Sequence, residues 1–143
     1  MTALDGDAIA ERALACVGTR FGHQGRLPGG HLDCLGLVVV AIGSPAACVD
    51  QRDYATEPDG DRLCAALEEH FERLDVLTID DAPVGSVLAF WLGRPKPSRV
   101  RHLGIRTGLG MVDARRQFGV VNRPIDDDLA ERLWGAFRWR AQP

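Results

Sequence analysis

The stretch HLDCLGLVVVAIG, residues 31–43, governs how the rest of the chain is interpreted. Asp33 is a good helix N-cap, so we expect Cys34 to be the first residue of a helix. The residues after it are apolar nearly all round as far as Gly43, which is typical of a central, buried helix. A thiol at a helix N-terminus meets unpaired peptide N–H groups and the positive end of the helix dipole, and both favour the thiolate. The same N–H groups can stabilise an oxyanion beside the sulfur.

The bulk properties indicate one ordinary globular domain. The chain has 143 residues, of which 45% are hydrophobic and 26% charged. We expect a single domain over residues 1–143. No apolar run approaches the ~20 residues that a membrane span requires, so no span is expected. The acidic, amphipathic N-terminus is not typical of a signal peptide.

Charge is divided unevenly along the chain. Residues 1–93 carry 6 Arg and 15 Asp or Glu, a balance of -9, whereas residues 94–143 carry 11 Lys or Arg and 5 Asp or Glu, a balance of +6. The basic half suits an anionic substrate or partner, and it equally suits a solvated sheet face. Aromatic residues are sparse there and no nucleic-acid motif appears, so nucleic acid is not an expected partner.

The order of elements predicts an α+β fold. Residues 4–18, 34–42 and 58–74 have helical patterns, and the glycine-rich residues 18–32 between the first two read as a long loop. From residue 74 the pattern changes to short β-rich segments separated by turns, with one short helix before the last. We expect N-terminal helices packed on a central antiparallel sheet, whose strands follow one another as a meander. The expected strands are 74–79, 85–92, 101–107, 110–114, 118–125 and 134–140.

A nucleophilic cysteine needs a base, and His102 is the best candidate. It begins a predicted central strand, where it can face the N-terminus of a helix packed on the sheet. Asp113 lies on the next strand, beyond the turn at residues 108–110, and can orient the imidazole. Alternatively, His102 is an ordinary polar residue of the strand, and Asp113 is an exposed aspartate at the end of its strand.

These residues together resemble the NlpC/p60 cysteine peptidases, a compact papain-like family. The resemblance rests on VGTRFGHQGRLPGGHLDCLGLV (residues 17–38), with RHLGI and GMVDA downstream, and it covers essentially the whole chain. It is strongest to a phage-tail branch, in which G-T-x-aromatic-x-x-Q-G-R-x-P-G leads into L-D-C-x-G-L. YATEPDG (residues 54–60) and the proline before VGSVLAF also fit the family.

The resemblance implies hydrolysis of amide bonds in peptidoglycan stem peptides, typically beside D-γ-glutamyl or diaminopimelate residues. By position Cys34 is the nucleophile, His102 the base and Asp113 the third polar residue. Three departures stand out. The third residue is usually His, Asn or Gln; Phe21 replaces a tyrosine whose hydroxyl lies near the nucleophile; and Ser86 replaces an aspartate after Gly85. Losing the tyrosine hydroxyl costs about 2–4 kcal/mol of transition-state stabilisation if it acts like an oxyanion-hole donor.

Four further residues are candidates for binding substrate. Asp33 caps the helix and, by resemblance, contacts substrate near the scissile bond. Gln24 and Arg26 either line the cleft or brace the loop, and Phe21 is expected at the cleft by its place in the motif. No metal or cofactor is expected, because His23, His31 and Cys34 lack a carboxylate or second cysteine that would complete a ligand spacing.

Three functions are compatible with this sequence. The first is a cell-wall peptidase carried on a virion or tail-like particle of a phage or gene-transfer agent, made in the bacterial cytoplasm and acting in the periplasm. The second is a structural tail-tip protein with the same fold and little activity, which Phe21, Asp113 and the charge asymmetry favour. The third is an amidase or acyl transferase of the same superfamily acting on another substrate.

Overall fold

The structure is a computed structural model that describes residues 5–43, 50–51, 54, 60–92 and 99–139. Most of the YATEPDG segment (residues 54–60) lies outside the described residues. Within the described part of the chain, no helix is long and apolar enough to cross a membrane.

Among the described residues, four α-helices form where the sequence predicts them, and the first and third are shorter than predicted. Asp5 caps the first helix, Asp33 the second and Asp126 the last, each through its side chain. The third ends at His70, four residues before the predicted end. The helices are α1 (Gly6–Ala15), α2 (Cys34–Ile42), α3 (Gly60–His70) and α4 (Asp127–Glu131), with a 3-10 helix at Ile79–Asp81.

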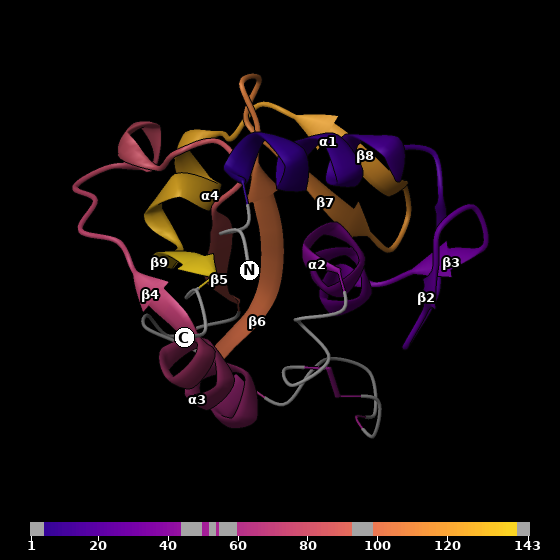
Figure 1. Ribbon diagram of the computed structural model, residues 1–143, viewed down its shortest axis with the longest axis horizontal. Helices are drawn as coiled ribbons and strands as arrows, with labels where there is room; N and C mark the ends of the chain where they lie inside the picture. The colour runs from indigo at the N-terminus through magenta and orange to yellow at the C-terminus, as the bar shows by residue number, and fades with distance from the viewer. Residues whose placement is uncertain (1–4, 44–49, 52–53, 55–59, 93–98, 140–143) are drawn as a thin grey trace.

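The main sheet is antiparallel and has six strands in the order β4-β9-β5-β6-β7-β8 (Figure 1). Its strands are β4 (Phe71–Arg73), β5 (Val87–Leu92), β6 (Arg99–Arg106), β7 (Met111–Arg115), β8 (Gly119–Arg123) and β9 (Leu133–Trp139). A small sheet of two-residue strands forms within the glycine-rich loop, in the order β1-β3-β2. These strands are β1 (Arg20–Phe21), β2 (Arg26–Leu27) and β3 (His31–Leu32).

Two expectations about the strands are wrong. The predicted strand at residues 74–79 is absent, and Phe71–Arg73 pairs with β9 instead. Phe71 is buried edge-on against Trp139, whereas Leu77 is 94% exposed, so burial favours the earlier segment. The sheet is also not a plain meander, because the last strand inserts between β4 and β5. Only long-range pairing decides that position.

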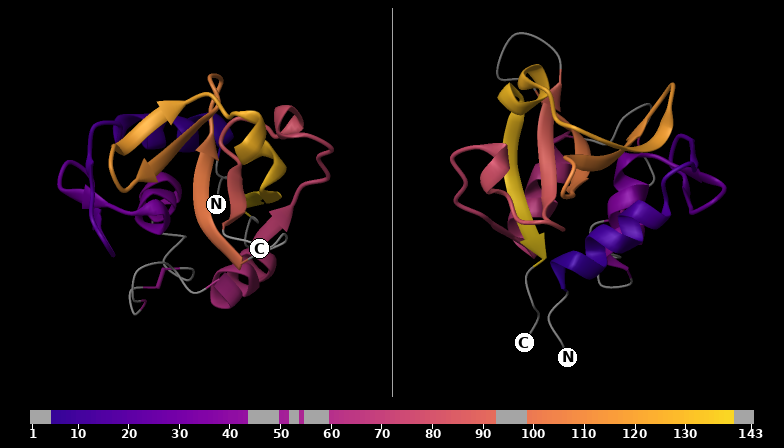
Figure 2. Two further views of the ribbon diagram at one scale, coloured as in Figure 1. Left: turned by 180° about the vertical axis from the view of Figure 1, so that it is seen from behind. Right: turned by 90° about the horizontal axis from the view of Figure 1, so that it is seen from above.

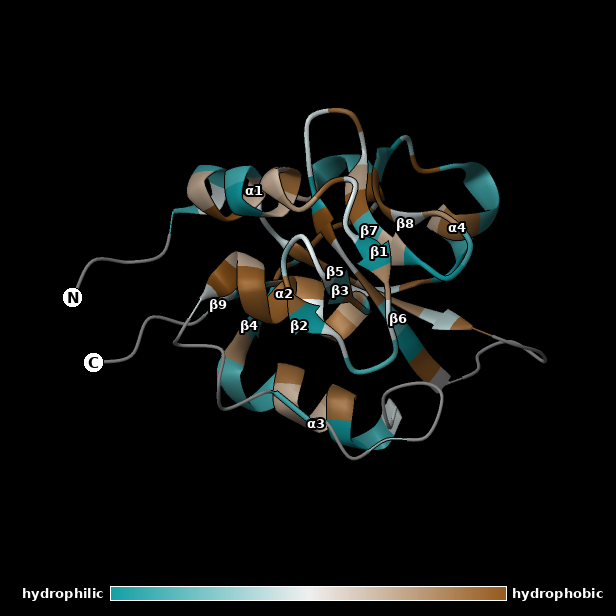
Figure 3. Ribbon diagram, turned by 90° about the vertical axis from the view of Figure 1, so that its right-hand side faces the viewer, coloured by the Kyte–Doolittle hydropathy of each residue, from teal (hydrophilic) through white to brown (hydrophobic). Residues whose placement is uncertain are grey.

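The sheet separates two hydrophobic clusters. Alternate residues of β5 contribute to different clusters: Val87 and Ala89 to the larger one with α1, α2 and α3, and Leu88 and Phe90 to the smaller one with Leu129 of α4. α2 contacts α1, β6 and β7, and Figure 2 shows α1 and α2 together on one side of the strands. In Figure 3 α2 is apolar along most of its surface, whereas α1 and α3 each show a hydrophilic face. The predicted buried central helix is confirmed.

Candidate active site

Cys34 is the first residue of α2, at the end of the helix that faces the sheet strand β6. Its side chain is buried, and its thiol donates toward the carbonyl oxygen of Arg101, 3.8 Å away. The Asp33 cap holds this end of the helix, because its carboxylate accepts from the Gly36 N–H at 2.8 Å. Cys34 is thus positioned by local helix chemistry, as the sequence predicts.

The Asp33 carboxylate receives hydrogen bonds on both oxygens. Oδ1 accepts from the Gly36 N–H and from Arg26 Nη1, the latter at 2.9 Å. Oδ2 accepts from the Gln24 N–H at 3.0 Å and from the Tyr54 hydroxyl. Burial, together with the hydrogen bond to Asp33, raises the pKa of Tyr54, which keeps its hydroxyl a donor. Asp33 lines the cleft, and its contacts are those of a helix cap rather than a free substrate ligand.

Gln24 and Arg26 were expected either to line the cleft or to brace the loop, and in the structure they brace the loop. Arg26 binds Asp50 at 2.8 Å and the Gln51 carbonyl at 2.6 Å, and its side chain is 8% exposed. Gln24 has a left-handed backbone (φ 59°), and its side-chain amide donates to the Tyr54 carbonyl at 2.7 Å. Neither lines the described cleft around Cys34.

His102 lies on β6 and Asp113 on β7, and the structure brings their side chains together. Nε2 of His102 is 2.8 Å from Oδ2 of Asp113, whose side chain is fully buried. The imidazole and the Cys34 thiol line the same cleft, and Nδ1 is the ring nitrogen that Asp113 does not occupy. The three predicted catalytic side chains therefore lie at one site, with His102 and Asp113 joined by a hydrogen bond.

Electrostatics favour a charged imidazole here. Burial alone lowers the pKa of His102, but the hydrogen bond to Asp113, its negative charge and the neighbouring Cys34 outweigh burial and raise this pKa to about 9. Burial likewise opposes ionisation of Asp113, yet the hydrogen bonds from His102 and Arg123 lower its pKa. A thiolate beside an imidazolium is the activated form of a cysteine nucleophile.

Arg123 of β8 was not among the residues predicted from the sequence. Its Nε donates to Asp113 Oδ1 at 3.0 Å and its Nη2 to Asp113 Oδ2 at 2.7 Å. Nothing in the local pattern of GVVNR distinguishes this arginine from the others in the basic half. Its role follows from the pairing of β7 with β8, which the sequence does not specify.

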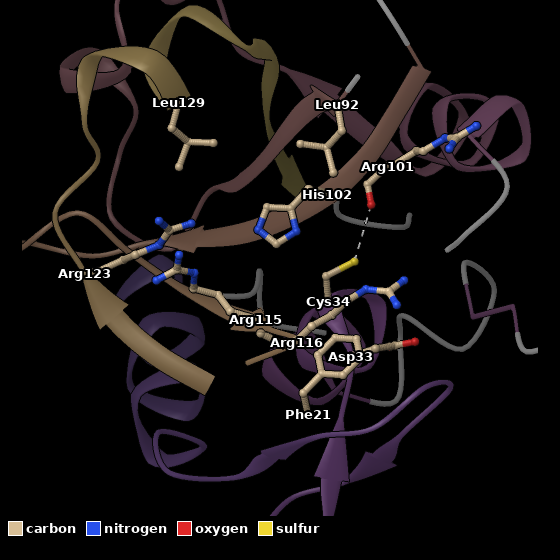
Figure 4. A pocket seen from close by; sticks show the side chains of 11 residues that line it. Phe21, Asp33, Cys34, Leu92, Arg101, His102, Arg115, Arg116, Arg123 and Leu129 are labelled. Carbon is tan, nitrogen blue, oxygen red and sulfur yellow. Dashed lines mark hydrogen bonds between the residues drawn. The ribbon is translucent and has the colours of Figure 1, made fainter. Parts of the chain in front are cut away.

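A cleft of about 280 Å³ opens over Cys34 and His102 (Figure 4). Among the described residues that line it, four are arginines and one, Asp33, is acidic. Phe21 lines it as predicted, and the Arg116 guanidinium lies 5.8 Å from the centre of its ring. The described lining residues are Phe21, Asp33, Cys34, Leu92, Arg101, His102, Ala114, Arg115, Arg116, Arg123 and Leu129.

His23 and His31 make their contacts within the loop region rather than in the cleft. The ring of His23 meets that of Tyr54 edge-on, with 5.3 Å between ring centres. The backbone of His31 pairs with β1 and β2, and its side chain lies against Gly22. Within the part of the chain that the structure describes, no three His, Cys, Asp or Glu residues are grouped so as to hold a metal ion.

The sequence matches no family model and no curated protein. The structure resembles NlpC1 from Trichomonas vaginalis, with a TM-score of 0.70 and 17% identity over 99% of this chain. It resembles an NlpC/p60 family protein from Bacillus cereus, with a TM-score of 0.67 and 19% identity over 96% of this chain. It also resembles the NlpC/p60 domain of the peptidoglycan hydrolase SagA, with a TM-score of 0.60 and 24% identity over 94% of this chain.

These similarities confirm the predicted α+β fold of the NlpC/p60 type. The chain spans 46% of the Trichomonas protein and 41% of the Bacillus protein, less than half of each, but it corresponds to 98% of the SagA domain. At these identities the similarity concerns the fold. What the chain does has to be argued from its own site.

Proposed function

We propose that this chain is a cysteine hydrolase that cleaves an amide bond in peptidoglycan stem peptides. One observation carries the proposal. The Cys34 thiol, at the N-terminus of a buried helix, lines the same cleft as His102, whose Nε2 is held 2.8 Å from Asp113. Nucleophile, base and orienting group together define nucleophilic catalysis of acyl transfer.

The first half of the reaction forms a thioester. The Cys34 sulfur attacks the carbonyl carbon of the scissile amide, and the carbon–oxygen π electrons move to the oxygen. When the tetrahedral intermediate collapses, the carbon–nitrogen bond breaks and the His102 imidazolium gives its proton to the departing amine. The N–H of Cys34 lies in the first helical turn, without a carbonyl partner inside the helix, and can donate to the oxyanion.

The second half regenerates the enzyme. His102 accepts a proton from water as the water oxygen attacks the thioester carbonyl. The carbon–sulfur bond then breaks, releasing a carboxylic acid product and the Cys34 thiolate beside the imidazolium. Asp113 keeps the ring oriented through both halves without taking the proton.

The charge of the cleft supports an anionic substrate. Arg101, Arg115 and Arg116 line it, and its acidic residue, Asp33, is engaged by Arg26. Stem peptides carry free carboxylates on their D-glutamyl and diaminopimelate residues, which arginines bind well. SagA, a solved neighbour, is a peptidoglycan hydrolase, and this agrees with the same substrate class.

We assign the chain to a virion or tail-like particle, made in the bacterial cytoplasm and acting at the cell wall. The support is the resemblance of residues 18–37 to the phage-tail branch. Mass spectrometry of purified tail-like particles from the source bacterium is expected to detect this chain. Its absence from particles that carry all their other components would overturn the assignment.

A structural tail protein without activity is the second candidate, and Phe21 favours it. The ring lies in the cleft where the family usually has a tyrosine, so one potential hydrogen-bond donor is missing. An amidase or acyl transferase acting on another substrate is the third. The products of the reaction separate all three.

The test uses purified protein, isolated sacculi and mass spectrometry of the released peptides. We expect wild type to release stem-peptide fragments, Cys34→Ala to release none, and Cys64→Ala to behave as wild type. Cys64 lies on α3 and does not line the described cleft, so it is a matched control for loss of a thiol. Equal release by wild type and Cys34→Ala would reject the proposal. Folded wild type that releases nothing would favour the structural candidate.

A further inference from the structure

We propose that Arg123 is a positioning residue that orients Asp113 toward His102 and offsets part of the negative charge that Asp113 presents to the ring. The inference rests on the proposed cysteine hydrolase function and concerns how its base is tuned. The sequence differs at Asp113 from the family that it resembles, in which His, Asn or Gln is usual. Arg123 supplies the positive charge that offsets the extra negative one.

The geometry of the pair is that of a two-point clamp. Arg123 reaches both oxygens of Asp113 with two hydrogen bonds, of 3.0 Å from Nε and 2.7 Å from Nη2. Oδ2 is shared, because it also bonds Nε2 of His102 at 2.8 Å. Paired arginine–carboxylate contacts of this kind fix both orientation and charge. The clamp therefore sets how Asp113 presents Oδ2 to the imidazole.

The register of β7 and β8 explains why the Arg123 side chain can reach the carboxylate of Asp113. Asp113 pairs with Val121 and Met111 pairs with Arg123, so Arg123 lies two residues along β8 from the position opposite Asp113. Side chains in this diagonal relation lie on the same face of a sheet. The Asp113 side chain is fully buried and that of Arg123 is 24% exposed. The carboxylate thus lies between the imidazole and the guanidinium, away from solvent.

The charge balance explains why a clamp is needed. A lone buried carboxylate beside an imidazole strongly favours the charged ring, and an imidazolium held too tightly is a poor proton donor to a leaving amine. An Asp–Arg pair has no net charge, so the ring meets a weaker negative field than a lone carboxylate would give. Arg123 thus lets His102 release its proton while Asp113 still orients the ring.

Several other groups face His102. Cys34 faces it from α2, Asp113 from β7 and Arg123 from β8. Arg101, its neighbour on β6, lines the same cleft, as do Arg115 and Arg116. Asp33 also lines the cleft, but four donors engage its carboxylate. Asp113 is thus the carboxylate in direct contact with the ring, and Arg123 is the cation in direct contact with that carboxylate.

The experiment is an NMR titration of His102 in protein with isotope-labelled histidine. All variants are made in a Cys34→Ala background, so that the thiol does not contribute and no hydrolysis is required. Arg123→Gln is expected to raise the titration midpoint of His102 by about one pH unit, because an uncompensated carboxylate remains. Asp113→Asn is expected to lower it. The Asp113→Asn, Arg123→Gln double variant is expected to return close to the parent, since a neutral pair replaces a neutral pair.

Two controls keep the test specific. Arg123→Lys retains the charge without the two-point geometry, so its midpoint should stay near the parent. Arg115→Gln removes an equal charge from the cleft without contact to Asp113, and its midpoint should move much less than that of Arg123→Gln. An unchanged midpoint in folded Arg123→Gln would overturn the proposal. So would a double variant that keeps the full shift of either single change.

The titration is independent of activity, so its failure and that of the proposed hydrolase are distinguishable. With Cys34 present, we expect Arg123→Gln to extend the alkaline limb of the activity profile to higher pH and to lower kcat. A fall in activity with no change in the pH profile would indicate a merely structural role and contradict the proposal.

Discussion

The guanidinium of Arg26 lies 2.9 Å from the carboxylate of Asp33, and both side chains are nearly buried, at 8% and 4% exposure. Arg26 links the helix cap to Asp50, to the Gln51 carbonyl and to the Tyr54 hydroxyl. The position of Cys34 thus depends on an ion pair that begins eight residues before it. The loop and the helix form one structural unit.

Arg26→Ala is expected to lower the free energy of unfolding by about 3 kcal/mol or more, because it leaves buried carboxylates without their cation. Chemical denaturation followed by circular dichroism measures the change. Arg138→Ala is the control, since its ion pair with Glu72 is exposed and worth at most about 1 kcal/mol. Equal losses in the two variants would show that the Arg26 network does not stabilise the fold.

Gly36→Ala is expected to destabilise the protein although alanine is the better helix former. A Cβ at Gly36 would overlap the carbonyl oxygen of Gly25, which belongs to the loop packed on α2. Alanine gains about 1 kcal/mol of helix propensity, and overpacking costs about 1–3 kcal/mol. We expect a net loss of stability by thermal unfolding. Gly108→Ala, with no atom within 4 Å of the new Cβ, should be neutral, and a stabilised Gly36→Ala would contradict the overlap.

Local signals were sufficient for the helical half of the site. The Asp33 cap, the apolar run to Ile42 and the glycine at residue 43 act within a few residues, so α2 and the place of Cys34 were predictable. The turn at residues 108–110 likewise placed His102 and Asp113 on neighbouring strands. Both predictions depend on contacts that are short in sequence.

The features that the sequence did not predict depend on contacts between residues far apart in the chain. Arg123 reaches Asp113 through the β7–β8 register, and Tyr54 reaches Asp33 across 21 residues. β9 inserts between β4 and β5, although many residues separate it from both. No periodicity in one sequence encodes such a choice, because it depends on which surfaces are left to bury.

Stability is expected to fall as the pH rises from about 6.5 to about 9, because the His102 imidazolium, which Asp113 stabilises in the folded protein, loses its proton. The folded pKa of His102, about 9, lies above the usual value of an unfolded histidine, near 6.5. Its contribution is fully present below the unfolded pKa and is lost as the pH rises through the folded pKa. The loss is on the order of 3 kcal/mol.

Urea unfolding at a series of pH values, for wild type and His102→Gln, isolates this contribution. The variant should show a flatter dependence over that window. Asp113 acts at the other end, where its lowered pKa means that its contribution disappears as the pH falls below about 4. Parallel curves for wild type and His102→Gln between pH 6.5 and 9 would contradict the assignment.

Arg115→Gln and Arg116→Gln are expected to weaken substrate binding more than they slow the chemical step. Both arginines line the cleft but neither contacts Asp113, so KM should rise on the order of tenfold while kcat changes little. Steady-state hydrolysis of a synthetic stem peptide measures both constants. The loss of substrate affinity should shrink at high salt, because screening already weakens the attraction in wild type.

Arg138→Gln changes the net charge equally, but it sits in an exposed pair outside the described cleft lining and should leave KM unchanged. If Arg138→Gln raised KM as much as the cleft variants do, the net charge of the protein, rather than the cleft, would set substrate affinity.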